Sequence, residues 1–247
     1  MTYREIKTTG FLGNFVQCFW EYANEGYVTE HTILPDGYFD LIAVFQNNQL
    51  QFIKLTGAWT TPVNIIIPEN TRIFAIRFKL LATEYLFRQE IKSIRDTARA
   101  LPADFWQIQS YQSHEFDRFV ADVTFHLDHS LKHLREIDNR KLELFALIYE
   151  QGVDSVAEIA DRVFWSSRQI NRYFNAQFGF PLKSFLKIVR CKTAYKDISN
   201  GSLHPGNNYF DQAHFIKDVK KITGSTPKEL FKNKNDRFLQ LSNTILP

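Results

Sequence analysis

Several features that mark secreted, membrane-spanning and disulfide-rich proteins are missing from this sequence. No apolar run approaches the roughly eighteen residues that a membrane-spanning helix needs, and the chain does not start with a charged segment followed by an apolar one. The two cysteines, Cys18 and Cys191, lie far apart and belong to no CxxC motif, which indicates a reducing compartment. We therefore expect a cytoplasmic protein with no membrane partner.

Motifs that identify common enzyme classes are missing as well. The chain has no glycine-rich phosphate loop, no GxSxG and no HExxH, and His31 is its only histidine before residue 114. The spacing of His126, His129 and His133 would let two of them share a metal ion. No cysteine or HExxH glutamate accompanies them, which favours a solvated helix face. We expect no catalytic residue, no metal and no cofactor.

Apolar and aromatic side chains are plentiful, and the charge is unevenly distributed. With 247 residues, 44% of them hydrophobic and 15% aromatic, the chain can form substantial cores, and its length favours two domains. Residues 138–247 hold 17 basic and 11 acidic side chains, a net +6, which leaves 13 minus 16, a net −3, for residues 1–137. A basic C-terminal part is typical of proteins that bind nucleic acid.

The first third of the chain has the pattern of β-structure. Five segments rich in Phe, Ile, Val and Tyr are bounded by turn residues, and the last alternates as a half-buried strand does. They lie at 15–22, 38–45, 50–56, 63–67 and 73–80. Such a series favours an antiparallel sandwich or small barrel, which can hold a small ligand. The residues that would line its mouth, although core packing is the simpler explanation for them, are Trp20, Tyr38, Trp59 and Arg77.

Helices are expected after the strands. Residues 82–107 have a helical pattern broken at Pro102, and a longer helix is expected over 113–135. One side of the longer helix is apolar, so it could pair with a copy of itself in a homodimer or pack on its own barrel. Another amphipathic helix is expected over 139–151, closed by Gly152.

The most informative stretch is 155–192. A capping box from Ser155 to Glu158 starts one helix, and a second capping box, from Ser166 to Gln169, starts another almost at once. Two short helices joined by so tight a turn must cross at a steep angle. This is the pattern of a helix-turn-helix.

The second of these helices separates apolar and polar residues by face. Ile170 and Phe178 lie on one side, whereas Arg168, Asn171 and Arg172 lie on the other. Arg matches the two acceptors of guanine, and Asn matches the donor and acceptor of adenine, so this face suits the major groove of DNA. A correct bidentate pair discriminates between bases by roughly 1–3 kcal/mol. A merely solvated polar face is the alternative.

A basic helix follows, and the pattern then repeats. Between residues 166 and 196 there are seven Lys or Arg and no Asp or Glu, a one-signed surface that favours an anion such as phosphate. A further helix is expected over 211–222. Gly224 and Pro227 end it as Gly179 and Pro181 end the earlier one, 45 and 46 residues before. This indicates an internal duplication, with two recognition helices joined by the basic helix.

Several segments of the sequence resemble a known family. VAEIADR, SSRQINRYFNAQFGFPLKSFLKIVRCKTA and YFDQAHFIKDVKKITGSTPKEL, within roughly residues 138–232, are similar to the DNA-binding domain of AraC-type transcriptional regulators. ILPDGYFDLI, LTGAWTTP and IFAIRFKL look like the sensor-like domain of one branch of that family. The resemblance implies two tandem helix-turn-helix units on double-stranded DNA, RNA polymerase as a partner and a small-molecule effector. The residues expected to contact DNA are Arg168, Gln169, Asn171, Arg172, Lys183, Lys187, Arg190, Gln212, His214, Lys217, Lys220 and Lys221.

The sequence departs from the family pattern at one place. Family members have a full amphipathic helix before the second recognition helix, but here only 199–208 is available, and it contains Pro205 and Gly206. Both residues break helices. The second unit is therefore expected to be shortened.

Together these patterns predict an α+β multidomain chain. Its parts are a β-rich sensor-like domain at 1–110, a connecting helix at 111–137, an all-α DNA-binding domain at 138–235 and a tail at 236–247. The expected function is sequence-specific transcriptional regulation without enzymatic activity. Two alternatives stay open: a DNA reader attached to an enzyme, such as a cysteine-dependent alkyl acceptor or a barrel metalloenzyme, and a protein-interaction scaffold.

Overall fold

The computed structural model describes residues 1–134, 136–204 and 209–233, and its first half is built from strands. In chain order these are β1 (Thr2–Lys7), β2 (Val16–Asn24), β3 (Thr29–Ile33), β4 (Phe39–Gln46), β5 (Gln49–Thr56), β6 (Val63–Ile67), β7 (Thr71–Phe78) and β8 (Ala98–Leu101). Six of them form one sheet in the order β1-β2-β7-β4-β5-β8, and β3 pairs with β6 in a second, two-stranded sheet. These pairings are all antiparallel, which confirms that part of the prediction.

The five predicted strands all form, and β6 has the predicted bounds. The helix predicted over 82–107 is wrong, because only Ala82–Tyr85 (α1) is α-helical there and β8 pairs with β5. Two short 3-10 helices, Lys92–Ile94 and Phe105–Ser110, flank β8, and a third, Gly10–Asn14, follows β1. The composition of this segment favours a helix only weakly, and pairing with a neighbouring strand overrides such a preference.

β7 lies in the middle of the larger sheet, between β2 and β4. On one face Phe74 and Ile76 join the main core, and on the other Ile73 and Ala75 pack in a cluster with Ile67 of β6. The prediction of a half-buried strand is therefore wrong for β7. The two-stranded sheet covers the face that would otherwise meet water.

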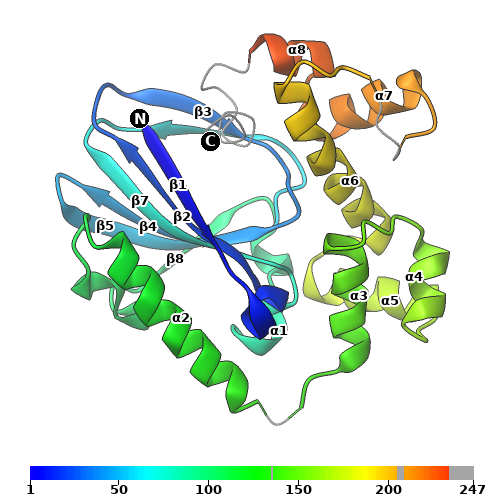
Figure 1. The fold of residues 1–247 in the computed structure, drawn as a ribbon, viewed down its shortest axis with the longest axis horizontal. Helices are drawn as coiled ribbons and strands as arrows, with labels where there is room; N and C mark the ends of the chain where they lie inside the picture. The colour runs from blue at the N-terminus through cyan, green and yellow to red at the C-terminus, as the bar shows by residue number, and fades with distance from the viewer. Residues whose placement is uncertain (135, 205–208, 234–247) are drawn as a thin grey trace.

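A long helix, α2 (Phe116–Lys132), covers the core face of the larger sheet (Figure 1). The rings of Phe116 and Phe119 lie 5.3 and 5.6 Å from that of Phe74, centroid to centroid. The sequence allowed the apolar side of this helix either to pair with a second copy or to pack on its own domain. In the structure it packs on its own sheet. Position 135, the predicted end of this helix, lies outside the described residues.

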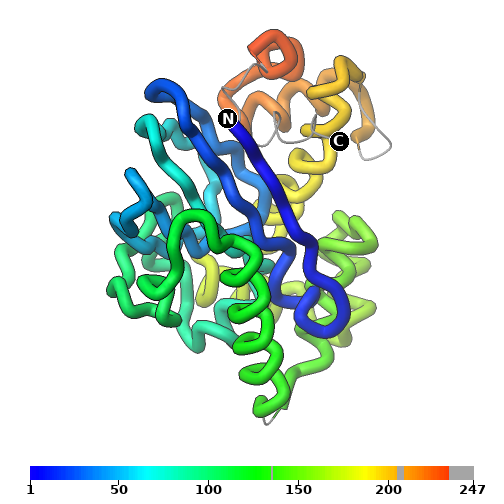
Figure 2. Tube along the Cα trace, turned by 60° about the vertical axis from the view of Figure 1, so that its left-hand side comes forward, coloured from blue at the N-terminus to red at the C-terminus, as the bar shows by residue number. Residues whose placement is uncertain are grey.

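The second half of the chain is helical. Its elements are α3 (Asn139–Tyr149), α4 (Val156–Arg162), α5 (Ser167–Gln177), α6 (Leu182–Ser199), α7 (Gln212–Thr223) and α8 (Pro227–Lys232). Figures 1 and 2 show α6 beside the strands, with α3, α4 and α5 near its start and α7 and α8 near its end. No helix in the described ranges is long and apolar enough to cross a membrane.

The two halves share a hydrophobic core. The main cluster of buried side chains runs from Phe78 of the sheet to Phe145 of α3, Phe174 of α5 and Phe185 of α6. A smaller cluster under α6, α7 and α8 includes Leu34 from the N-terminal half. The boundaries at 110 and 137 stay predictions, and the predicted tail at 236–247 lies outside the described residues.

Candidate nucleic-acid interface

α4 and α5 are joined by a tight turn whose geometry follows from local capping. The Ser155 hydroxyl accepts the Glu158 N–H at the start of α4. Phe164, just after α4, adopts a left-handed conformation with φ of 53°. Ser166 and Gln169 then form the predicted capping box, which begins α5. The chain therefore turns sharply between the two helices, as their capping signals indicate.

α5 has one buried side and one exposed polar side. Ile170 and Phe174 are fully buried, whereas Arg168 and Arg172, one helical turn apart, are exposed. Neither guanidinium group is covered by the N-terminal half of the chain. Two exposed guanidinium groups on one helix face can reach base edges in a groove.

Two other predicted contacts on α5 already have partners within the protein. The side-chain oxygen of Asn171 accepts the Leu182 N–H at 3.1 Å, so Asn171 caps the start of α6. The side-chain oxygen of Gln169 accepts both the N–H and the hydroxyl of Ser166, each at 2.9 Å. In a bidentate pair between Asn171 and adenine, the amide oxygen would therefore have to accept from the base and from the Leu182 N–H at once.

The basic surface of α6 is less one-signed than its sequence. Lys183 is exposed, but Arg190 pairs with Asp154 at 3.0 Å and with Asp218 at 2.7 Å, and Lys187 lies 3.7 Å from Asp218. These acidic partners come from the segment before α4 and from α7, outside the acid-free stretch. The expectation of a one-signed surface is corrected, because two carboxylates of the same chain neutralise part of its charge.

α7 begins at Asp211, whose carboxylate accepts the N–H of His214 at 2.7 Å. The ring of His214 lies 3.3 Å from Asp218, so this side chain turns toward the acid that α7 itself buries. The side-chain amide of Gln212 donates to the carbonyl oxygen of Leu203 at 2.8 Å. The predicted DNA-contacting residues of α7 that are exposed are Gln212, Lys217, Lys220 and Lys221, whereas His214 is half-buried.

α5 and α7 match each other at a constant spacing. Their N-caps, Ser166 and Asp211, are 45 residues apart, as are Gly179 and Gly224, which end them with φ of 80° and 73°. α4 precedes α5, but the described residues between α6 and α7 form no helix. Pro205 and Gly206, the predicted helix breakers, lie outside the described residues.

The N-terminal half holds α5 at its C-terminal end. The N–H of Ile91 donates to the carbonyl oxygen of Gln177 at 3.0 Å, and the Arg95 guanidinium donates to that of Gly179. Because these contacts lie at the end of the helix, they leave the exposed polar side of α5 free.

The turn Pro35-Asp36-Gly37 connects the sheet to α3 and α6. Tyr195 of α6 donates its hydroxyl to the carbonyl oxygen of Pro35, and Tyr149 of α3 donates to that of Gly37, both at 2.7 Å. A Cβ added to Gly37, which has φ of 85°, would come within 3.0 Å of Val189. The helical half therefore fixes this turn as firmly as the strands do.

Three of the four residues predicted to line a ligand site meet around Arg77. Its guanidinium lies 3.3 Å from Asp40 and 3.6 Å from Asp36, over the rings of Trp20 and Tyr38. The Trp20 indole donates to Asp40 at 3.0 Å. Burial raises the pKa of Asp40, and Arg77 opposes that rise. The sequence pattern did not single out these two aspartates. Because they neutralise Arg77, an anionic ligand would have to displace one of the carboxylates.

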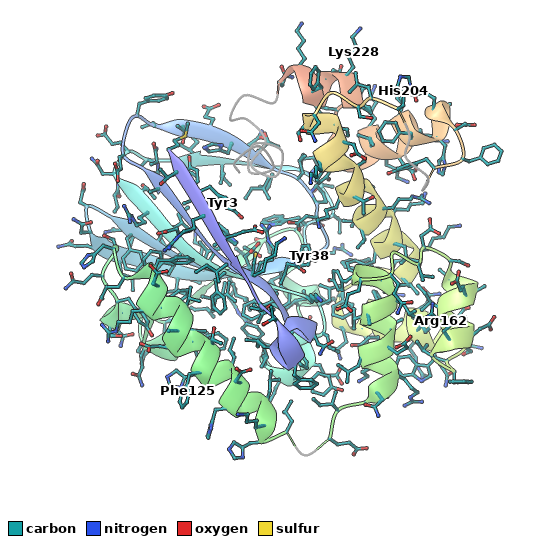
Figure 3. The ribbon with its side chains drawn as sticks, in the orientation of Figure 1. Tyr3, Tyr38, Phe125, Arg162, His204 and Lys228 are labelled. Atoms are coloured by element: carbon teal, nitrogen blue, oxygen red, sulfur yellow. The ribbon has the colours of Figure 1, made fainter. Side chains whose placement is uncertain are left out.

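Trp59, the fourth predicted residue, is half-buried between β5 and β6, and it is not among the ion-pair and ring partners of Arg77 in the described part of the chain. Tyr38 also lines a cavity of about 290 Å³ with Tyr149, Leu186 and Lys192, where the sheet meets α3 and α6. Figure 3 shows Tyr38 at this boundary. The volume is near the lower end of small-ligand sites.

The cysteines and histidines do not form a reactive centre in the described residues. Burial raises the pKa of the Cys18 and Cys191 thiols to about 12, so neither is a thiolate near neutral pH. The rings of His129 and His133 are 4.4 Å apart on an exposed helix side. Across 1–134, 136–204 and 209–233, no group of three or more potential metal-ligating side chains gathers.

Comparison with known proteins finds one family, and it covers only the sheet region. Residues 4–99, less than half of the chain, match a family described as a domain of unknown function (DUF6597). No curated protein matches the sequence.

Solved structures of ToxT from Vibrio cholerae are similar to the chain along most of its length. One is 10% identical and covers 94% of this chain and 98% of that chain, with a TM-score of 0.43. Another, bound to (E)-4-(8-methylnaphthalen-1-yl)but-3-enoic acid, is 10% identical and covers 94% and 99%, with a TM-score of 0.45. These scores are too low to establish a shared fold, and they support no function here.

Proposed function

We propose that this protein is a sequence-specific, double-stranded DNA-binding transcriptional regulator in which α5 and α7 enter the major groove. The observation that carries the proposal is the matched design of these two helices. Each has a polar N-cap, a buried apolar side and exposed basic residues, and α6 joins them. A helix-turn-helix presents its second helix to DNA in this way, so α4 and α5 form one unit and α7 is the recognition helix of a shortened second unit.

The exposed cations have two different roles in this proposal. Arg168 and Arg172 pair with guanine, since a guanidinium matches both guanine acceptors in the major groove. Lys183, at the start of α6, and the exposed lysines of α7 contact phosphates, which supply affinity without base preference. Arg190 and Lys187 act chiefly by holding α7 on α6 through Asp218.

The N-terminal half is proposed as a domain that senses a small-molecule effector or mediates dimerisation. Asp36 supports the sensing role, because it pairs with Arg77 and lies in the turn that α6 and α3 hold by Pro35 and Gly37. A ligand that changed the Arg77 pairing would therefore act on the helix that joins α5 to α7. RNA polymerase and a second copy of the chain are further proposed partners.

Two alternatives belong to other classes. An enzyme attached to a DNA reader is disfavoured as a thiol acceptor, because both cysteines are buried. A protein-interaction scaffold would bind a partner through the same helices without affinity for DNA.

Selection from random-sequence duplexes, followed by titration of the selected site over a range of salt, tests the proposal. We expect log K to fall by about 0.9 per decade of salt for each phosphate neutralised. Arg172→Ala should weaken binding to the selected site by about 1–3 kcal/mol more than binding to random DNA. Lys183→Ala should weaken both alike and lower the salt slope by about one.

Lys132→Ala at the end of α2 is the matched control, since Lys132 is an exposed lysine outside the helical half. It should leave both affinities unchanged. Failure to bind any duplex, or binding that did not respond to salt, would refute the proposal. Retained self-association in the absence of DNA binding would favour the scaffold.

A further inference from the structure

α7 and the residue before it carry apolar side chains that are exposed to different extents. Phe210, just before the helix, is 93% exposed, Ile216 is 37% exposed, and Ala213 between them is also exposed. Ala213 and Ile216 are three residues apart in α7, so they share one face of the helix, and Phe210 lies just before its N-cap, Asp211. The exposed Lys217 and Lys220 flank them.

The packing of α7 does not depend on this apolar strip. The helix is held by its other side, where Phe215, Val219 and Ile222 join Tyr195 and Leu230 in a buried cluster that does not include Ile216. Asp218 fixes the same side to α6. The exposed apolar residues therefore lie on the side of α7 that the described residues leave open.

The constant spacing of 45 residues gives these positions counterparts on α5. Ala213 stands where α5 has Arg168, and Ile216 stands where it has Asn171. At these positions α5 has polar side chains, the exposed guanidinium of Arg168 and the Asn171 amide that caps α6, whereas α7 has hydrocarbon. If both helices bind the same duplex, side chains this different should prefer different bases at these two positions.

The major groove displays one apolar group, the C5 methyl of thymine, and apolar side chains such as Ala and Phe contact it. We infer that α7 recognises thymine methyl groups through Ile216 and Ala213, with Phe210 covering the methyl nearest the helix start. This inference rests on the proposed function. The flanking lysines supply the charge complementarity to phosphate that brings an apolar strip against a polyanion.

Replacing thymine by uracil in the selected duplex, one position at a time, tests the inference, because uracil lacks only the methyl group. For the unmodified protein we expect at least one replacement to lower affinity about fourfold, the effect of losing one buried methyl-sized group. With Ile216→Ser, the same replacement should change affinity by less than twofold, since the contact is already lost. Each comparison is made within one protein, so a general loss of stability in the variant cancels.

Lys217→Ala is the matched control on the same helix face. It should weaken binding to both duplexes and leave the thymine-to-uracil ratio unchanged, because a phosphate contact does not sense the methyl. Absence of any DNA binding by the unmodified protein overturns the proposed function and this inference together. DNA binding with no sensitive thymine, or with a ratio that Ile216→Ser leaves intact, overturns the inference alone. A protein, rather than DNA, would then be the partner of this strip.

Discussion

Removing the charge of Asp218 should loosen α7 from α6 and lower the stability of the whole chain. The carboxylate is 6% exposed and lies 2.7 Å from Arg190, 3.3 Å from His214 and 3.7 Å from Lys187. Asp218→Asn keeps the shape of the side chain but leaves Arg190, itself 15% exposed, without its buried partner. Breaking a buried ion pair costs about 3–5 kcal/mol.

The lower end of that range applies, because Arg190 retains Asp154, whose side chain is 46% exposed. We therefore expect a loss of about 3 kcal/mol in the free energy of unfolding. For a chain of this size, each kcal/mol lowers Tm by roughly 2–4 °C, so Tm should fall by about 6–12 °C. Thermal unfolding followed by circular dichroism measures this change.

Asp197→Asn is the control, because Asp197 is an exposed acid on α6, the helix against which α7 packs. It should change the free energy of unfolding by less than about 0.5 kcal/mol. The effect of Asp218→Asn should also persist in high salt, since a buried pair is poorly screened. A loss no larger than that of Asp197→Asn, or one that salt abolishes, would show that the contacts of Asp218 do not hold α7 in place.

Two further predictions concern the junction between the halves and the buried thiols. Tyr195→Phe leaves the buried carbonyl oxygen of Pro35 without its donor and should lower the free energy of unfolding, measured by urea denaturation, by about 1–3 kcal/mol. Tyr27→Phe is the control, because Tyr27 is exposed between β2 and β3, and it should cause no measurable change. Equal stability of the two variants would mean that this bond does not tie α6 to the sheet. With thiol pKa values of about 12, Cys18 and Cys191 should have about one thiolate in ten thousand at pH 8 and should react with a thiol reagent only after unfolding. Rapid labelling of the native chain would contradict their burial.

Local signals were sufficient for much of the helical half. Ser166 and Gln169 lie within one helical turn, so their capping box forms wherever that segment folds, and Gly179 ends α5 in the left-handed conformation that glycine tolerates. The spacing of apolar residues likewise located the buried sides of α5 and α7. Five of the six strands between residues 15 and 80 followed from β-branched and aromatic composition, with errors of a few residues at their ends, but β3 was not predicted.

Contacts between distant segments could not be derived in this way. The segment 82–107 has a helical composition, but its pairing with β5 made Ala98–Leu101 a strand. The alternation in β7 indicated one wet face, but the two-stranded sheet covers it. In each case the structure depends on a strand that is distant in the sequence, and the local periodicity of a segment carries no information about such a partner.

The candidate site also has features that local sequence predicts and features that depend on the tertiary structure. Chain order alone placed Arg168 and Arg172 on an exposed helix face, because helical geometry relates residues three or four apart. Folding in three dimensions brought Arg190 and Lys187 of α6 to the carboxylate of Asp218 on α7, and it surrounded Arg77 with two aspartates. Ion pairs form between side chains that are close in space, and burial strengthens them. The composition of this protein therefore gave its charged residues, but only the tertiary structure showed which of them are paired within the chain.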